Sequence, residues 1–188
     1  MGILNFLFKK KPFVPDFEET EYQNYLSFIG EGGTEDEWER LKAQNGWKFK
    51  QDPIEIYRKY QKEVKPVSDY YYHLLQLIQS EWSVLYNLNN YNGKRAEEFE
   101  KMCFNGIGCY MEMREIDLKY NKKTPLNVPA FTRLAMLYEK QGEYEKAVFI
   151  CKEACALGID QRSRLVRMIK KSGRVPNAEE TALIENNL

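Results

Sequence analysis

The side chains that could carry catalysis in this chain are few. Its 188 residues include one histidine, His73, and four cysteines. A cysteine nucleophile needs a neighbouring base, most often a histidine, and no spacing in the sequence brings Cys103 or Cys109 close to His73. One histidine also leaves histidine-rich metal sites without ligands. We therefore predict no cysteine catalysis, and we expect His73 to be a partly buried packing residue.

The spacing of the cysteines raises the question of a zinc site. Cys151 and Cys155 are four residues apart and share one face of a predicted helix, where two thiolates could bind zinc. Cys103 and Cys109 would have to supply the other two ligands. Six residues turn an α-helix by about 240°, so these two side chains would point apart unless the glycines between them break the helix. We favour buried, reduced thiols, and predict no metal and no cofactor.

A glycine-rich segment, residues 30–34, precedes another predicted helix. Such turns at helix starts can bind phosphate through backbone amides. Here no strand leads into the segment, no lysine follows it, and acidic residues surround it. We interpret it as a flexible linker that ends in a helix cap at Thr34. Because no spacing assembles a cluster of ionisable groups, we predict that the protein is not an enzyme.

Composition limits the remaining classes. Basic and acidic side chains number 28 each, and 43% of residues are hydrophobic and 14% aromatic. This excludes a globally basic nucleic-acid binder and a disordered chain, and it fits one core or two small domains. No stretch approaches the roughly 18 to 20 apolar residues that cross a bilayer, and no leader pattern is seen, so we expect a cytoplasmic protein.

Helices are the elements that must position any site. Apolar residues recur at spacings of three and four along almost the whole chain, which predicts an all-α fold of about eight helices. Start signals support the boundaries: capping-box spacing at Asp16, Thr34 and Asn177, each followed three residues later by glutamate, and a cap with a following proline at Asp52.

Two long helices are predicted over 67–88 and 94–120, after a short helix that ends near Val64. A five-residue loop joins the long pair, which predicts an antiparallel hairpin. The first carries one apolar stripe through Tyr71, Ile78 and Trp82. The second is apolar nearly all round, so we expect it to be the central, most buried helix. Gly106 and Gly108 inside it predict close helix contact or a kink.

Four short helices are predicted after this hairpin, over 128–140, 143–157, 161–171 and 178–185. Residues 128–161 resemble one tetratricopeptide repeat. The matching positions are Phe131, Leu134, Ala135, Tyr138, Gly142, Tyr144, Ala147 and Ala154. The small residues allow two helices to approach closely, and the glycine suits the turn between them. Cys151 and Ile159 depart from the pattern, and no second copy of the repeat is evident.

The resemblance implies a right-handed solenoid fragment built of antiparallel helical hairpins, with the 67–120 hairpin as the preceding layer and C-terminal capping helices. In this family the first helix of a repeat lines a groove that holds a peptide. Carried over by position, the partner-binding residues are Thr132, Arg133, Met136, Glu139 and Lys140. The asparagine and lysine that clamp a terminal carboxylate in some members are replaced here by Thr132 and Met136.

The chain divides into an apolar and basic segment over 1–15, a short-helix region over 16–66 and the repeat-like domain over 67–188, with 16–188 as one domain the alternative. From Met1 to Lys11 an apolar run precedes three lysines. That composition suits weak membrane association, or a tail that docks on the body or stays loose.

Basic residues gather near the end of the chain. The patch consists of Arg162, Arg164, Arg167, Lys170, Lys171 and Arg174. It could contact an acidic protein or nucleic-acid phosphates, or be a solvated face. Without interleaved aromatic residues for base stacking, an acidic partner is favoured over nucleic acid.

These patterns predict a non-catalytic adaptor that binds a peptide or protein partner through the groove or its basic flank. The alternative is a peripheral membrane or nucleic-acid-associated regulator, which would use residues 1–11 or the basic helix.

Overall fold

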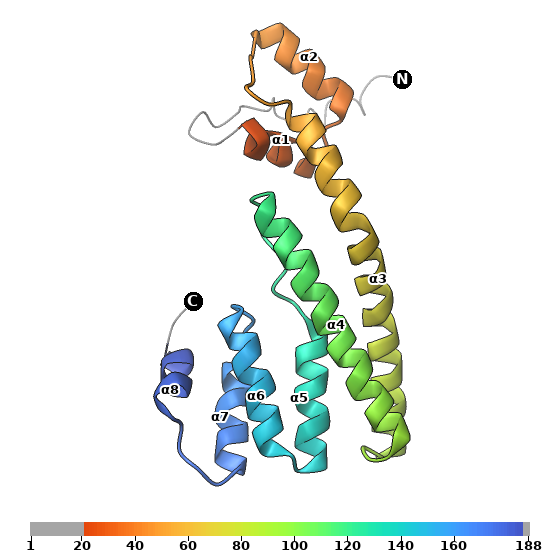
Figure 1. Cartoon of the computed structure of the whole chain (residues 1–188), viewed down its shortest axis with the longest axis vertical. Helices are drawn as coiled ribbons and strands as arrows, with labels where there is room; N and C mark the ends of the chain where they lie inside the picture. Colours follow the sequence, from red (N-terminus) through yellow and green to blue (C-terminus); the bar gives the residue numbers. More distant parts are fainter. Residues whose placement is uncertain (1–20, 186–188) are drawn as a thin grey trace, which may run out of the picture. The chain divides into compact units, whose positions relative to one another are not determined.

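In the computed structural model, which describes residues 21–185, every regular element is an α-helix (Figure 1). The predicted all-α class is therefore confirmed. The elements are α1 (Glu21–Gly30), α2 (Glu35–Asn45), α3 (Pro53–Leu88), α4 (Lys94–Lys119), α5 (Pro129–Gln141), α6 (Tyr144–Ala156), α7 (Arg162–Lys171) and α8 (Ala178–Glu185). The segment from Met1 to Lys11 and the Asp16 cap lie outside the described residues.

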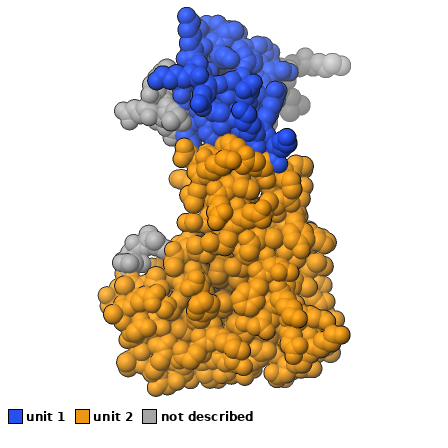
Figure 2. Space-filling model, in the orientation of Figure 1, with its two compact units in different colours: residues 1–62 blue, residues 63–188 orange. Residues whose placement is uncertain are grey.

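The chain forms two compact units, Met1–Lys62 and Glu63–Leu188, coloured separately in Figure 2. The described part of the first unit has an aromatic core centred on the fully buried Trp38. The Tyr25 ring meets Trp38 edge-on at a centroid distance of 5.3 Å, and Phe49 stacks on it at 5.8 Å.

The turn between α1 and α2 corrects the expectation of a flexible linker. Gly33 lies so close to Phe28 that a Cβ there would sit 2.3 Å from the ring, and its amide donates to the Phe28 carbonyl. The predicted cap at Thr34 is confirmed: the Glu37 amide donates to its hydroxyl at 3.3 Å, and the Glu37 carboxylate accepts from the Thr34 amide at 2.9 Å. The glycines therefore form a closed, ordered turn.

Helix α3 corrects a second expectation, because it runs without a break through Pro66, where the sequence predicted one helix to end and another to begin. Proline inside a helix removes one backbone hydrogen bond and costs about 3 kcal/mol. Pro66 is exposed, and so is Lys62, whose carbonyl loses its partner, so solvent can satisfy that group. Burial of Val64, Tyr71 and Ile78 along the opposite side outweighs the loss.

Helix α4 packs against both α3 and α5 at Gly106. A Cβ added there would lie 3.0 Å from the Ile78 Cδ1 and 3.4 Å from the Ala130 Cβ, which confirms the predicted close contact. The same prediction is wrong for Gly108, which has nothing within 4 Å of an added Cβ and lies in an unbroken helix. The helix is also not buried all round, since Phe104 is 46% exposed.

Small residues bring the later helices together. Along the second unit α4 packs on α5, α5 on α6 and α6 on α7. Ala135, Ala147 and Ala154 are fully buried, so the predicted small-residue seam between α5 and α6 is confirmed. Gly142 closes the turn between them with a left-handed φ of 77°. Between α3 and α4 the contact is instead aromatic, with Trp82 and Phe99 centroids 5.8 Å apart.

Candidate protein-interaction face

The predicted groove residues lie along one side of α5, and all are half-buried except the exposed Lys140. Most are held by neighbouring helices. The Thr132 hydroxyl accepts from the Gln161 side chain at 2.8 Å, and Arg133 donates to Gln79 on α3 at 2.9 Å. Lys140 has its Nζ 5.3 Å from the centroid of the Tyr91 ring.

Glu139 is the point at which α5 meets α7. Its carboxylate, on a side chain 17% exposed, lies 3.4 Å from Arg164 Nη1, 2.9 Å from Arg167 Nη2 and 2.8 Å from Lys171 Nζ. Burial opposes its ionisation, but the hydrogen bonds from Arg167 and Lys171 outweigh burial and lower its pKa. Glu139 is therefore an ionised carboxylate with three cationic neighbours.

Arg133 is a further cation, close enough to Arg164 for their charges to repel. Its guanidinium lies 5.4 Å from the centroid of Trp82, a cation–π contact. Burial, and then the positive charge of Arg164, lower the pKa of Arg133; burial, and then Arg167, lower that of Arg164. Both guanidinium groups stay charged at neutral pH. The lowered pKa values reflect a free-energy cost, because the two guanidinium groups are partly desolvated and repel one another.

The spacing of the basic residues along α7 explains why their side chains converge on Glu139. Arg164, Arg167 and Lys171 follow the i, i+3, i+7 spacing that places side chains on one helix face. Gln161, just before α7, donates to Thr132 and accepts from Arg164 Nε at 3.1 Å, which ties the start of the helix to α5. We define the α5–α7 face by its residues: Thr132, Arg133, Met136, Glu139, Arg164, Arg167 and Lys171.

The structure thus joins the two residue sets that the sequence kept apart, the groove and the basic patch. The spacing on α7 was visible beforehand, and so was Glu139 on the predicted groove. Their convergence was missed because it depends on how α5 and α7 pack around α6.

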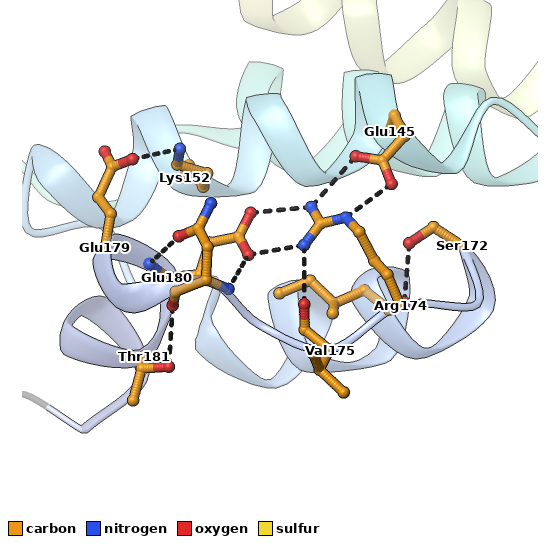
Figure 3. Close-up of polar contacts among 10 residues, drawn as sticks. Glu145, Lys152, Ser172, Arg174, Val175, Glu179, Glu180 and Thr181 are labelled. Atoms are coloured by element: carbon orange, nitrogen blue, oxygen red, sulfur yellow. Dashed lines mark hydrogen bonds and ion pairs between the residues drawn. The ribbon is translucent and has the colours of Figure 1, made fainter.

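The rest of the basic patch lies elsewhere. Arg162 pairs with Asp160 at 3.1 Å, and Lys170 is exposed. Arg174 has a structural position, shown in Figure 3: it bridges Glu145 on α6, at 2.8 Å, and Glu180 on α8, at 2.7 Å.

Glu180 is 1% exposed and forms the predicted capping box with Asn177, each backbone amide donating to the other side chain at 2.9 Å. The hydrogen bond from Arg174 is the main cause that lowers the pKa of Glu180 to about 2. Arg174 therefore docks α8, and its charge is neutralised by the two glutamates.

An apolar groove between α4 and α6 was not predicted from the sequence. It measures about 270 Å³ and is lined chiefly by Phe104, Ile107 and Met111 from α4 and by Phe149, Ile150 and Leu157 from the α6 region. Phe149 is 57% exposed. The unusual exposure of two phenylalanines could not be read from helices that looked uniformly apolar.

The residues first considered for catalysis are dispersed. His73 is exposed, which contradicts the expected packing role. Cys103, Cys151 and Cys155 are buried, as predicted, and Cys109 is half-buried. Burial raises the pKa of Cys103 and raises that of Cys151 to about 12, so both are protonated thiols at neutral pH. Over residues 21–185 no three histidine, cysteine or acidic side chains gather as metal ligands.

Comparison with known proteins adds no relative. No protein-family model matches the chain, and it has no match among the curated proteins or the solved structures. Across residues 21–185 each helix is either too short or too polar to span a lipid bilayer. Any function must therefore be argued from the side chains themselves.

Proposed function

We propose that this protein is a non-catalytic interaction module that holds a peptide segment of a partner protein on the α5–α7 face. The observation that carries the proposal is a surplus of cations on a helix face. Three of them, Arg164, Arg167 and Lys171, share the carboxylate of Glu139, and Arg133 adds positive charge near Arg164. Bringing like charges together costs free energy, and an incoming ligand of opposite charge would recover it.

Preorganisation supports the same proposal. Several of the side chains are already fixed by hydrogen bonds to other helices, as in Arg133 to Gln79 and Arg164 to Gln161. A surface whose side chains are ordered before binding loses less entropy when a partner arrives. Such a face suits recognition of a short segment.

The tetratricopeptide resemblance, as a proposal, points to the same helix. If α5 and α6 form one repeat, then α5 is the first helix, whose inner side would line the groove. The seam of Ala135 and Ala147 and the turn at Gly142 are compatible with that reading. A cytoplasmic location belongs to the same proposal.

The nucleic-acid alternative is weakened because the six patch residues do not form one continuous surface. Arg164, Arg167 and Lys171 converge on Glu139, whereas Arg162 pairs with Asp160 and Arg174 pairs with Glu145 and Glu180. A phosphate backbone needs a row of available cations. Membrane attachment through residues 1–11 stays a prediction from the sequence.

Selection from a random peptide library displayed on phage tests the proposal. The wild-type chain should enrich a shared motif, and Arg167→Glu should lose that enrichment. Lys170→Glu is the matched control, because it reverses an exposed charge on the same helix away from Glu139, and it should keep the motif. If the wild-type protein enriches no motif, or if Arg167→Glu enriches the same one, the proposal is wrong.

A further inference from the structure

We infer that the segment bound on the α5–α7 face is acidic, and that Glu139 occupies the position of its carboxylate in the free protein. This inference rests on the proposed function and specifies the partner class. It follows from the charges, the unused donors and the exposure of the residues around Glu139.

The charges come first. Glu139 is the carboxylate within ion-pair distance of Arg164, Arg167 and Lys171, and Arg133 has no acidic ion-pair partner among the described residues. Three cations therefore share one carboxylate, and the positive charge of Arg133 lies near one of them, Arg164. Elsewhere in the second unit cations and carboxylates are closer to balance, as in the pairs of Arg95 with Glu81 and Lys119 with Glu63. A local excess of this kind favours an anionic partner.

The donors come second. Arg167 uses one nitrogen, Nη2, toward Glu139 Oε2, and Arg164 uses Nη1 toward the same oxygen. A guanidinium carries five N–H donors and is suited to bidentate pairing with a carboxylate. Lys171 approaches the other oxygen, Oε1, at 2.8 Å. Both oxygens of Glu139 are thus engaged by these cations, and the remaining guanidinium N–H groups give an incoming carboxylate its first contact before it replaces Glu139.

Exposure shows which cations a partner reaches. The Arg167 and Lys171 side chains are 49% and 42% exposed, whereas Arg164 is 18% exposed and Glu139 17%. The two outer cations are open to an incoming carboxylate, while Arg164 supports Glu139 from within. An acidic residue of the partner therefore competes with Glu139 for Arg167 and Lys171.

The competition predicts an unusual result: removal of an acidic side chain improves binding of an acidic ligand. The probe is a fluorescently labelled peptide of alternating glutamate and serine, followed by fluorescence anisotropy, with a glutamine–serine peptide as the neutral control. Glu139→Gln should bind the acidic probe roughly tenfold more tightly than wild type, the worth of about one charge-assisted hydrogen bond. Arg167→Gln should bind it roughly tenfold more weakly.

Matched variants isolate the position. Glu143→Gln removes the carboxylate that pairs with Lys146 in the same hairpin, and it should leave the affinity unchanged. Equal tightening by Glu143→Gln and Glu139→Gln would reduce the effect to net charge and overturn the inference. If Glu139→Gln fails to fold by circular dichroism, Arg167→Gln decides: wild-type affinity for the acidic probe would overturn the inference.

Two further outcomes separate this inference from the proposed function. A phage-enriched motif that is neutral or basic would end the inference and leave the interaction module standing, while no motif at all would end both. A single-stranded DNA oligonucleotide of the same charge as the acidic probe is the last arm. Binding of the oligonucleotide as tight as that of the peptide would replace the acidic segment with nucleic acid.

Discussion

Two networks of basic side chains and glutamates in the second unit differ in their balance of charge. Around Glu139 one carboxylate meets Arg164, Arg167 and Lys171. Around Arg174 one guanidinium meets two carboxylates, Glu145 and Glu180 (Figure 3). In the first network cations outnumber the carboxylate, and in the second the two carboxylates neutralise the one guanidinium. The comparison teaches that a basic patch defined by composition can divide into a proposed binding surface and a structural clasp, the contacts of Arg174 with Glu145 and Glu180.

Burial separates the two networks as well. Glu180 is among the most buried polar side chains of the described residues, and it also caps α8 through Asn177. Arg167 and Lys171 keep much of their surface in solvent. A buried ion pair loses much stability when one partner is removed, because the other charge is left without compensation, whereas exposed pairs contribute little.

The largest expected effect is loss of the clasp. Arg174→Ala leaves Glu180 buried without its cation and should destabilise the docking of α8 by about 3 to 5 kcal/mol. Hydrogen exchange should show the α8 amides losing protection, while those of α4 and α5 keep theirs. Lys170→Ala, on the neighbouring exposed position, is the control and should change stability by no more than about 0.5 kcal/mol. If the α8 amides of Arg174→Ala kept wild-type protection, Arg174 would not be needed to dock α8, and the distinction between the two networks would be wrong.

Acid should release the same clasp. The pKa of Glu180 falls from 4.5 to about 2 on folding, mainly through the hydrogen bond from Arg174. A group whose pKa is lowered on folding stabilises the folded state above its unfolded pKa. That contribution should be lost as the pH falls from about 4.5 toward about 2. Protection of α8 should decline over this window, and Glu180→Gln should flatten the decline; an identical profile in that variant would refute it.

A smaller effect is expected at the centre of the cation face. Glu139→Gln removes the carboxylate that Arg164, Arg167 and Lys171 share, so repulsion among them should lower stability by roughly 1 to 2 kcal/mol. Thermal or urea unfolding measures the change. The double variant Glu139→Gln with Arg167→Gln should recover part of the loss. A double variant less stable than Glu139→Gln alone would show that Arg167 contributes more than an excess charge.

The smallest effect is predicted at the outer edge of that face. Lys171→Gln removes one of three cations and leaves Glu139 with two others, so the free energy of unfolding should change by less than about 0.5 kcal/mol. Urea unfolding checks this value. A loss near that of Arg174→Ala would make the cation face a clasp too, and the comparison would fail.

The fold was predictable where local chemistry decides it. Helix starts at Thr34, Asp52 and Asn177 followed from side chains that bond nearby amides, and the alanine seam followed from spacing along α5 and α6. The break expected at Pro66 did not occur, because the local cost of proline is outweighed by a buried stripe that extends through the whole helix. The helix-breaking tendency of proline is a local property of the sequence, and it does not include the free energy of burying a stripe along the whole helix.

The candidate site was predictable only in parts. Each residue of the α5–α7 face had been named, on the groove or on the patch, yet the pairing of Glu139 with α7 depends on tertiary packing. Arg174 looked like any other patch residue until Glu145 and Glu180 were seen on either side of it. Gly106 and Gly108 carried the same sequence signal, and the approach of Ile78 at one of them was needed to tell them apart.

The central claim is that the α5–α7 face carries positive charge available to a partner. Its most direct test is a salt titration of binding between the wild-type chain and the glutamate–serine peptide. The dissociation constant should rise steadily with ionic strength, and the rise should be shallower for Arg167→Gln, because fewer charges are then screened. A dissociation constant that does not depend on salt, or equal slopes for the two proteins, would contradict the account.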